Sequence, residues 1–230
     1  MTTIALVHGA HHGAWCWERL TPELERRGLK VVAPDLPCDD PRAGIAEYAA
    51  VVEAALDGEQ DVVIVGHSLG SLTIPVVASR LTVRRMVFLC SVPTGPGPPV
   101  SENMAEMVTQ AFLAAPRFHD AAGTELLSNQ AFRELFFHDC GEGDACWAIA
   151  HLRPQASRPT TAASPLVAWP DVPLSVILAA DDRAVRIEWA LPEARARLGG
   201  GEPIIVPGSH SPFVSRPSDL ADILAAEAGR

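Results

Sequence analysis

The run Gly66-His67-Ser68-Leu69-Gly70 is the part of the sequence best suited to covalent chemistry. It follows the apolar run Val62–Val65, and a helix-like stretch comes directly after it. A serine in a sharp strand-to-helix turn is exposed to a substrate, and the turn is tight enough to need small residues on either side. The pattern therefore predicts that Ser68 is a nucleophile that attacks a carbonyl carbon.

A serine hydroxyl is a weak nucleophile at neutral pH and needs a base to take its proton. His210 follows the apolar run Pro203–Val206, where such a base is expected after a late strand. Asp181 and Asp182 follow another apolar run, and one of them must orient the imidazole. We favour Asp182 as this acid, and Asp181 stays open as the alternative.

An attacked carbonyl develops negative charge on its oxygen, which backbone N–H groups can stabilise. The amide of Leu69 lies at the start of the expected helix, where N–H groups point toward the turn. The amide of Ala10 lies in the small-residue loop that follows the first apolar run, Ile4–Val7. We predict that these two amides form an oxyanion hole and that His8 braces the loop.

Metal and cofactor chemistry has little support in the sequence. His8, His11 and His12 share one loop, but no carboxylate or cysteine accompanies them at ligand spacing. The five cysteines are odd in number and none shows the spacing of a redox or zinc pair. We expect no metal ion, no other cofactor and reduced thiols.

The residues above must be positioned by an alternation of strands and helices. Near-continuous apolar runs, which are typical of strands buried on both faces, are Ile4–Val7, Val31–Ala33, Val62–Val65, Met86–Leu89, Leu174–Leu178 and Pro203–Val206. The stretches expected to be helical between the early runs are Trp17–Arg27, Ile45–Leu56 and Ser71–Leu81. This order predicts an α/β fold with a parallel sheet covered by helices on both faces.

Residues 93–170 interrupt this rhythm. The segment opens with a turn-rich stretch of prolines and glycines and has no convincing strand. Its expected helices are Met104–Leu113, Thr124–Phe137 and Ala145–Leu152. We predict a helical cap over a core made of residues 1–92 and 171–230. Most of its aromatic residues should pack inside the cap, and one or two, with Trp147 as the candidate, should face the site.

The charge of the chain narrows the function classes. Its net charge is −10 and it has no basic cluster, so binding to nucleic acid is not expected. No apolar run approaches the roughly 18 residues that a membrane helix needs, and the first residues lack a signal-peptide pattern. The sequence therefore predicts a cytoplasmic protein without a membrane or nucleic-acid partner.

The loop, the turn and the tail together resemble a known family. The opening run Val7-His8-Gly9-Ala10-His11-His12-Gly13-Ala14-Trp15-Cys16-Trp17 is similar to that of the plant methylesterase and hydroxynitrile lyase group of α/β-hydrolases, which includes salicylate methylesterases and has bacterial relatives. The resemblance continues through residues 32–36, residues 66–70 and residues 208–217, and Leu152-Arg153-Pro154 is similar to a family segment. It implies an α/β-hydrolase fold with a six-stranded, mostly parallel sheet, a small helical cap and the triad Ser68, Asp182 and His210.

The resemblance also bears on the reaction. The lyases of this group carry a threonine where this chain has Gly9 and a lysine where it has Ser211, so the resemblance disfavours cyanohydrin cleavage. His11 stands where plant members often have cysteine, and Gly9, His11 and Trp147 are candidate substrate contacts. We expect a serine-dependent carboxylic ester hydrolase that acts on a small, largely apolar ester through an acyl-enzyme.

Three alternatives stay open. The same triad could hydrolyse a thioester, or it could catalyse a lyase or cyclisation step, because this fold hosts many chemistries. The chain could also be a non-catalytic ligand receptor, although that class is expected to lose triad residues and none is missing here. A homodimer is a further expectation.

Overall fold

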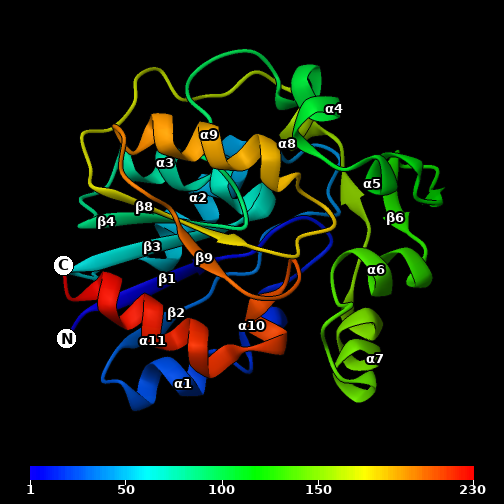
Figure 1. Cartoon of the computed structure of the whole chain (residues 1–230). Coiled ribbons are helices and arrows are strands. Elements are labelled where there is room, and N and C mark those ends of the chain that lie inside the picture. The colour runs from blue at the N-terminus through cyan, green and yellow to red at the C-terminus, as the bar shows by residue number, and fades with distance from the viewer.

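The computed structural model describes all residues from 1 to 230, and its centre is a six-stranded parallel sheet (Figure 1). The strands run in the order β2-β1-β3-β4-β8-β9. Their bounds are β1 Thr3–Val7, β2 Lys30–Val32, β3 Val62–His67, β4 Arg85–Leu89, β8 Leu174–Ala179 and β9 Ile204–Val206. Each overlaps one of the six apolar runs, so the predicted sheet is confirmed.

Helices cover both faces of this sheet because its side chains alternate between two cores. Ile4 and Leu6 belong to one buried cluster, whereas Ala5 and Val7 belong to the other. The first cluster is closed by α1 (Thr21–Arg26), α10 (Pro212–Ser215) and α11 (Pro217–Ala228), and the second by α2 (Ile45–Ala55), α3 (Ile74–Ala78) and α9 (Ile187–Arg197). In Figure 1, α1 and α11 lie below the sheet and α3 and α9 above it.

Two of the predicted helices are broken into two pieces. The stretch expected at Trp17–Arg27 is a 3₁₀ turn, η1 (Ala14–Trp17), followed by α1, and the stretch at Ser71–Leu81 is η2 (Ser68–Leu72) followed by α3. A proline stands in the first turn of both α-helices, Pro22 in α1 and Pro75 in α3. Since proline lacks an N–H group and fixes φ, it starts a new helix more readily than it continues one.

Most of residues 93–170 lie beyond the carboxyl ends of the strands, at the right of Figure 1, and the loops at the two ends of the segment pass over the top of the molecule. The helices of this segment are η3 (Val100–Asn103), α4 (Met104–Met107), α5 (Gln110–Ala114), α6 (Asn129–Leu135), α7 (Glu142–His151) and α8 (Arg158–Thr161). A second, antiparallel sheet joins β5 (Arg117–His119), β6 (Thr124–Leu127) and β7 (Gln155–Ala156). The expectation that this segment has no strands is therefore wrong.

The turn between β5 and β6 explains this correction. Asp120 accepts hydrogen bonds from the backbone of Ala122 and Thr124, both at 2.9 Å, and Gly123 has a φ of 82°. An aspartate that caps its own turn and a glycine in the left-handed region are the ordinary parts of a tight connection between strands. Thr124 therefore starts a strand, and Ser128 caps the helix that follows.

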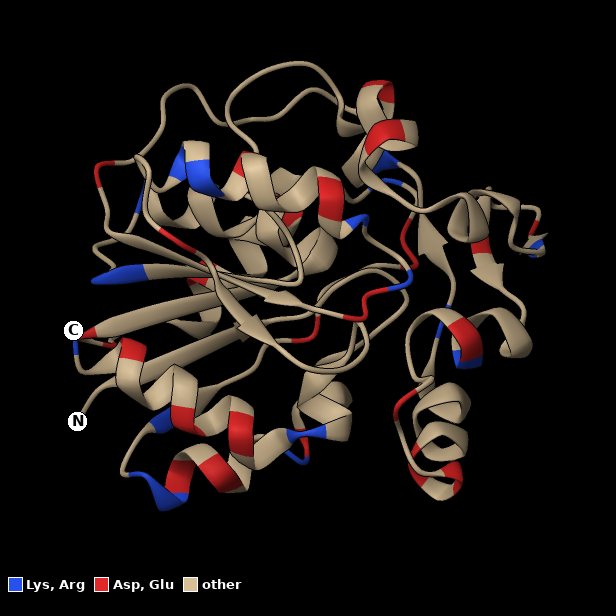
Figure 2. Ribbon diagram, in the orientation of Figure 1, with Lys and Arg blue, Asp and Glu red and all other residues tan.

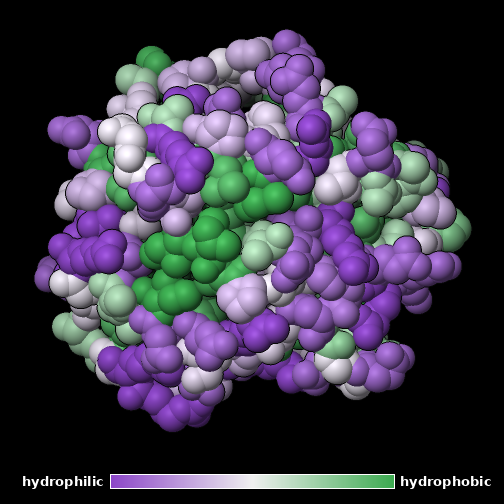
Figure 3. Space-filling view, in the orientation of Figure 1, coloured by the Kyte–Doolittle hydropathy of each residue, from purple (hydrophilic) through white to green (hydrophobic).

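The surface of the core carries both charged and apolar areas. Figure 2 shows acidic residues along α11 and both acidic and basic residues along α1. Arg27, which follows α1, pairs with Glu23 and with Asp222 of α11. Figure 3 shows an apolar area over the edge strand β9, between α9 and α11, and Ile205 on this strand is 47% exposed. No helix is both long and apolar enough to cross a bilayer. The homodimer stays a prediction.

Candidate active site

Ser68 lies at the junction of β3 and η2 with a φ of 48°, in the left-handed region. This conformation costs a non-glycine residue on the order of 1–2 kcal/mol, so the surroundings must hold it in place. A Cβ at Gly70 would lie 2.5 Å from the carbonyl oxygens of Val7 and His8, and one at Gly66 would lie 2.8 Å from the Cα of Ser71. Only glycine fits at these two positions, which explains the spacing of the motif.

His210 and Asp182 form a buried pair at the carboxyl ends of β9 and β8. The Nδ1 of His210 lies 2.6 Å from Oδ2 of Asp182, and their side chains are 1% and 4% exposed. The second oxygen of Asp182 accepts hydrogen bonds from the backbone of Ala184 at 2.8 Å and of Val185 at 2.9 Å. The carboxylate is thereby held in one orientation, with the imidazole Nδ1–H pointing at it.

Asp181 has a different position. It is exposed, and its Oδ2 accepts a hydrogen bond from the backbone N–H of Gly208 at 3.1 Å. Its carboxylate therefore ties two loops together and does not contact the imidazole. Of the two carboxylates that the sequence left open, the structure brings Asp182 to His210.

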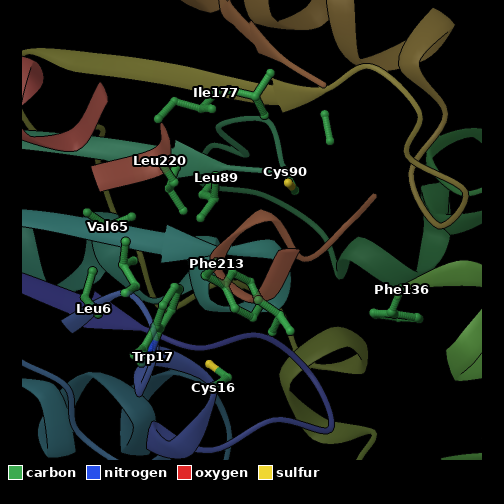
Figure 4. Packing of buried hydrophobic residues seen from close by; sticks show 14 of the residues in the cluster. Leu6, Cys16, Trp17, Val65, Leu89, Cys90, Phe136, Ile177, Phe213 and Leu220 are labelled. Atoms are coloured by element: carbon green, nitrogen blue, oxygen red, sulfur yellow. The ribbon is translucent and has the colours of Figure 1, made fainter. Parts of the chain in front are cut away.

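A second histidine, His67, holds the backbone of His210 in place. The Nε2 of His67 donates to the carbonyl of His210 at 2.9 Å, and burial lowers the pKa of His67 well below its ordinary value, so the ring is neutral. Phe213 packs between this ring and Trp17, with centroids 4.8 Å and 4.7 Å away. Figure 4 shows Phe213 and Trp17 together under the strand ends. The loop that carries His210 thus rests on the aromatic core.

Residues 136–138 hold both triad loops from the other side. Ser209 donates its hydroxyl to the carbonyl of Phe136 at 2.8 Å, and the Nε2 of His138 donates to the carbonyl of Asp181 at 2.9 Å. The ring of Phe136 stands perpendicular to that of His210 at 5.0 Å. Segment 93–170 therefore helps to position the base and the acid.

His8 fixes the peptide that carries the N–H group of Ala10. The backbone N–H of Leu36 donates to Nε2 of His8 at 2.9 Å, which leaves the proton on Nδ1, and Nδ1 donates to the carbonyl of Gly9 at 2.9 Å. In a trans peptide the C=O of one residue and the N–H of the next point in opposite directions. By holding the Gly9 carbonyl, His8 sets the direction of the Ala10 N–H. This is the bracing role that the sequence predicts for His8.

His12 holds the next peptide of the same loop. Its Nδ1 donates to the carbonyl of Ala10 at 2.7 Å, and burial lowers its pKa to about 3. Gly9 lies behind the serine: a Cβ there would meet Nδ1 of His67 at 2.8 Å and Cβ of Ser68 at 3.1 Å. Gly9 allows close packing and does not line the cavity, so the expectation that it contacts the substrate is wrong.

A cavity of about 400 Å³ opens in front of Ser68. Ser68, His210, Ala10 and Leu69 all contribute to its wall. Most of the remaining wall is apolar and includes Leu72, Met104, Met107, Phe112, Phe136 and Trp189. Two of the aromatic residues of segment 93–170, Phe112 and Phe136, thus face the site, as the sequence suggested for one or two of them.

His11 lines this cavity next to Ala10 and has a φ of 64°. Its Nδ1 lies 3.3 Å from the carbonyl of Arg153, which can only accept, so this nitrogen carries the proton. Burial lowers the pKa of His11 to about 4, and the ring is neutral. The Nε2 atom is left as a hydrogen-bond acceptor on a wall that is otherwise largely apolar.

Trp147 does not line the cavity, so the expectation for this residue is wrong. Its ring packs edge-on against Trp15 at 5.3 Å and lies under the guanidinium of Arg19 at 4.9 Å. Arg19 also pairs with Asp144 of α7 at 2.7 Å. Trp147 therefore attaches α7 to the core, and its size and apolarity did not reveal which side of the helix it occupies.

Arg153 is a residue whose role the sequence did not reveal. Its guanidinium donates to Oδ1 of Asp35 at 2.9 Å, to the carbonyl of Leu36 at 2.6 Å and to the carbonyl of His12 at 3.0 Å. These bonds tie segment 93–170 to the loop of Ala10. The resemblance of Leu152-Arg153-Pro154 to a family segment was the available signal.

The histidines of the first loop do not converge on one point, because each bonds a different carbonyl. The donor atoms that come within 4.8 Å of one another belong instead to His67, Cys90 and His210. Each of these histidines already uses one ring nitrogen, and burial raises the pKa of the Cys90 thiol well above its ordinary value. A cation here would have to displace that thiol proton.

Comparisons with known proteins place the chain among known relatives. Residues 4–223 match the alpha/beta hydrolase family. The chain is 26% identical to a pyrethroid hydrolase of Sphingobium wenxiniae over 98% of this chain and 87% of that protein. It is 38% identical to methylesterase 3 of Arabidopsis thaliana over 31% of each chain.

Solved structures show the same fold. The crystal structure of methylesterase MES16 from Arabidopsis superposes with a TM-score of 0.83 at 20% identity, covering 100% of this chain and 99% of that one. Polyneuridine aldehyde esterase also gives 0.83, at 19% identity and 99% coverage of both chains. With the sequence match over nearly its whole length, the chain belongs to the alpha/beta hydrolase family and is related to its methylesterases and to a pyrethroid hydrolase.

Proposed function

We propose that this protein is a serine-dependent carboxylic ester hydrolase that works through an acyl-enzyme. The observation that carries the proposal is the 2.6 Å contact between Asp182 and His210, because His210 lines the same cavity as Ser68. Ser68 is held in the left-handed region at the tip of β3. A nucleophile, a base and an acid that orients the base are the parts that acyl transfer requires.

In the first half-reaction, Nε2 of His210 takes the proton of the Ser68 hydroxyl while Oγ attacks the ester carbonyl carbon. The carbonyl electron pair moves to oxygen, and the amides of Ala10 and Leu69 stabilise the resulting oxyanion. When the tetrahedral intermediate collapses, the bond to the alcohol oxygen breaks. His210 returns its proton to that oxygen, and the alcohol leaves.

In the second half-reaction, His210 takes a proton from water, and the hydroxide attacks the acyl-enzyme. The second tetrahedral intermediate collapses, His210 returns the proton to Oγ of Ser68, and the carboxylic acid is released. Asp182 keeps the Nδ1–H tautomer in both halves and stabilises the imidazolium that forms twice per turnover. Apart from the ester and one water molecule, every group in these steps belongs to the chain.

The apolar wall favours an ester whose acyl and alcohol parts are largely apolar. A cavity of about 400 Å³ exceeds what a small methyl ester fills, so the site also admits larger esters than the small one expected from the sequence. Named relatives include methylesterases and a pyrethroid hydrolase, which supports this substrate class. His11 contributes a polar contact beside the oxyanion loop.

The decisive test uses Ser68→Ala with a p-nitrophenyl ester and a fluorophosphonate probe. The wild type should show a burst of p-nitrophenol and one labelled serine, and the variant should show neither. Ser79→Ala, a substitution of the same kind on α3 away from the cavity, should behave as the wild type. Turnover or labelling that persists in Ser68→Ala would refute the assignment, and an unlabelled wild type would favour the ligand receptor.

A further inference from the structure

Two further serines, Ser71 and Ser91, line the cavity beside the nucleophile. Ser71 lies three residues after Ser68 in the 3₁₀ helix η2, where side chains three apart lie above one another. Ser91 follows β4, the neighbour of β3 in the sheet, two residues past Leu89, which pairs with His67. Both residues therefore lie on the same part of the cavity wall as Ser68, and the ester mechanism uses neither hydroxyl.

The hydrogen bonds of this pair fix where its protons are. Ser71 donates its hydroxyl to the carbonyl of Gly66 at 2.8 Å, and a carbonyl oxygen can only accept. The hydroxyl oxygens of Ser71 and Ser91 also form a hydrogen bond. Since the one proton of Ser71 is already committed, Ser91 must be the donor in that bond.

The consequence for Ser91 is a fixed polarity. A hydroxyl carries one proton and two lone pairs. Because the proton of Ser91 points at Ser71, its oxygen can offer the cavity only a lone pair. A serine hydroxyl can usually bond either a donor or an acceptor. Toward the cavity, the hydroxyl of Ser91 can act only as an acceptor.

The surroundings of Ser91 make the polarity of its hydroxyl important for binding. Ser71 is 2% exposed, and Ser91 is itself half-buried between the buried residues Cys90 and Val92. A hydrogen bond that is partly shielded from water is worth more than one at the surface, and an unmatched polar group there costs more once a ligand covers it. A ligand group that faces Ser91 must therefore bring a proton of its own.

Building on the esterase function proposed above, we propose that Ser91 is a specificity residue that accepts a hydrogen bond from a hydroxyl on the acyl group, next to the scissile carbonyl. The preferred substrates are thus hydroxy esters. An ester with hydrogen at that carbon leaves the lone pair of Ser91 unmatched, and an ether oxygen there faces it with a second lone pair. Sites built to bond a substrate hydroxyl discriminate strongly against analogues that lack it.

The experiment compares three methyl esters of one skeleton: methyl mandelate, each enantiomer separately, methyl phenylacetate and methyl α-methoxyphenylacetate. The wild type should favour one mandelate enantiomer over the phenylacetate about tenfold or more in kcat/KM, as expected for one hydrogen bond. In Ser91→Ala this ratio should fall to about one. Ser91→Thr, which keeps the hydroxyl oxygen, should retain most of the preference.

Ser71→Ala tests the proton assignment itself. With its partner oxygen removed, the Ser91 hydroxyl can donate to the cavity, so the α-methoxy ester should gain several-fold relative to the mandelate. Ser79→Ala is the matched control, because Ser79 also donates to a backbone carbonyl, that of Val76 at 2.7 Å, but lies away from the cavity. Ser79→Ala should leave the relative kcat/KM values of all three esters unchanged.

The outcomes separate this inference from the esterase function. If Ser68→Ala abolishes turnover of all three esters but Ser91→Ala lowers them by the same factor, Ser91 is structural and the inference is wrong while the function stands. A wild type without preference for either mandelate enantiomer would overturn it as well. If Ser68→Ala keeps turning over the phenylacetate, the proposed function fails first.

Discussion

The cavity has two walls that are built in different ways. The core wall presents backbone groups and short side chains at the ends of the strands, among them Ala10, Ser68 and His210. The opposite wall comes from segment 93–170 and presents longer side chains such as Met104 and Met107, which are only partly buried. Hydrogen bonds fix the first wall, and mainly apolar side chains form the second.

This difference predicts how substitutions act. On the core wall each hydrogen-bonding side chain works in one position only, since His8, His12 and Asp182 each bond defined backbone atoms. A change there should lower kcat or the stability of the fold. On the opposite wall contacts are replaceable, because a thioether chain adapts to many shapes. A change there should alter KM and leave chemistry intact.

The largest effect is expected from Asp182→Asn. The amide cannot hold the imidazole tautomer in which Nδ1 carries the proton, and loss of this orientation costs triad enzymes about 10⁴-fold in kcat. Asp181→Asn is the matched control on the neighbouring residue, and it should change kcat less than about threefold. Steady-state rates on a p-nitrophenyl ester measure both. Equal losses in the two variants would contradict the position of Asp182 as the acid.

Gly70→Ala should be the most damaging change to the fold of the core wall. The added Cβ would lie 2.5 Å from two carbonyl oxygens of the β1 end, and backbone atoms cannot move aside cheaply. We expect a loss of at least 3 kcal/mol in the free energy of unfolding, within the range of severe core substitutions. Denaturant unfolding measures it.

Gly143→Ala is the matched control for this prediction. Gly143 lies in α7 of the opposite segment, and an added Cβ meets nothing within 4 Å. Gly143 is the second residue of α7, where alanine is favoured over glycine by less than the about 1 kcal/mol of a helix interior, so this variant should be at least as stable as the wild type. If both variants lost stability equally, the contrast between the walls would not hold.

The core wall could be predicted from the sequence because each of its residues stands at a strand end. Apolar runs located the strands, and the positions just after them held Ser68, His210 and the two aspartates. The choice between Asp181 and Asp182 needed coordinates, since both follow the same strand and only backbone geometry decides which reaches the imidazole. Ser91 also follows a strand, but a lone serine gave no sign of the proton arrangement that sets its polarity.

The opposite wall was predicted less well. Strands of three or four residues, such as β5 and β6, have too little periodicity to separate them from short helices. Prediction from local sequence is limited in the same way for the single side chain of Trp147. Its place depends on Trp15 and Arg19, more than a hundred positions earlier in the chain, and no local pattern encodes that contact.

A third prediction concerns the pH dependence of the core wall. The pKa of His12 is lowered from 6.5 to about 3 by burial, so between these values the unfolded chain binds a proton that the folded protein does not. The free energy of unfolding should therefore fall as pH falls below 6.5, by roughly 1.4 kcal/mol per pH unit for this residue. From pH 7 to pH 5 the loss is about 2 kcal/mol.

The variant His12→Phe tests this slope. Phenylalanine can keep the stacking on Trp15, whose ring lies 5.5 Å away at 15°, but it cannot bind a proton. The variant loses the bond to the Ala10 carbonyl and should be less stable at pH 7, yet its stability should depend less on pH than that of the wild type. Denaturant unfolding at pH 7, 6 and 5 measures both slopes, and identical slopes would show that His12 does not contribute.

The smallest effect is expected from Met107→Ala on the opposite wall. The backbone of this stretch stays attached to the core, because the carbonyl of Met107 accepts from the N–H of Arg186 at 2.9 Å and Thr109 donates its N–H to Ala184 at 2.9 Å. Only the contact between the side chain and a bound acyl chain is lost, worth about 1 kcal/mol for a partly buried side chain. KM for a p-nitrophenyl hexanoate should rise roughly fivefold, whereas KM for the acetate should barely change.

The value of kcat decides whether the two walls are separate in function. The value of kcat should stay within about twofold for both esters, because Met107 takes no part in the hydrogen bonds that hold Ser68, His210 or Asp182. Glu106→Ala, which truncates the exposed neighbour outside the cavity, should change neither constant. A fall in kcat that is equal for the acetate and the hexanoate would show that segment 93–170 acts on the chemical step as well. The hydrogen bonds between residues 136–138 and the loops of His210 and Asp181 would then be the contacts to test.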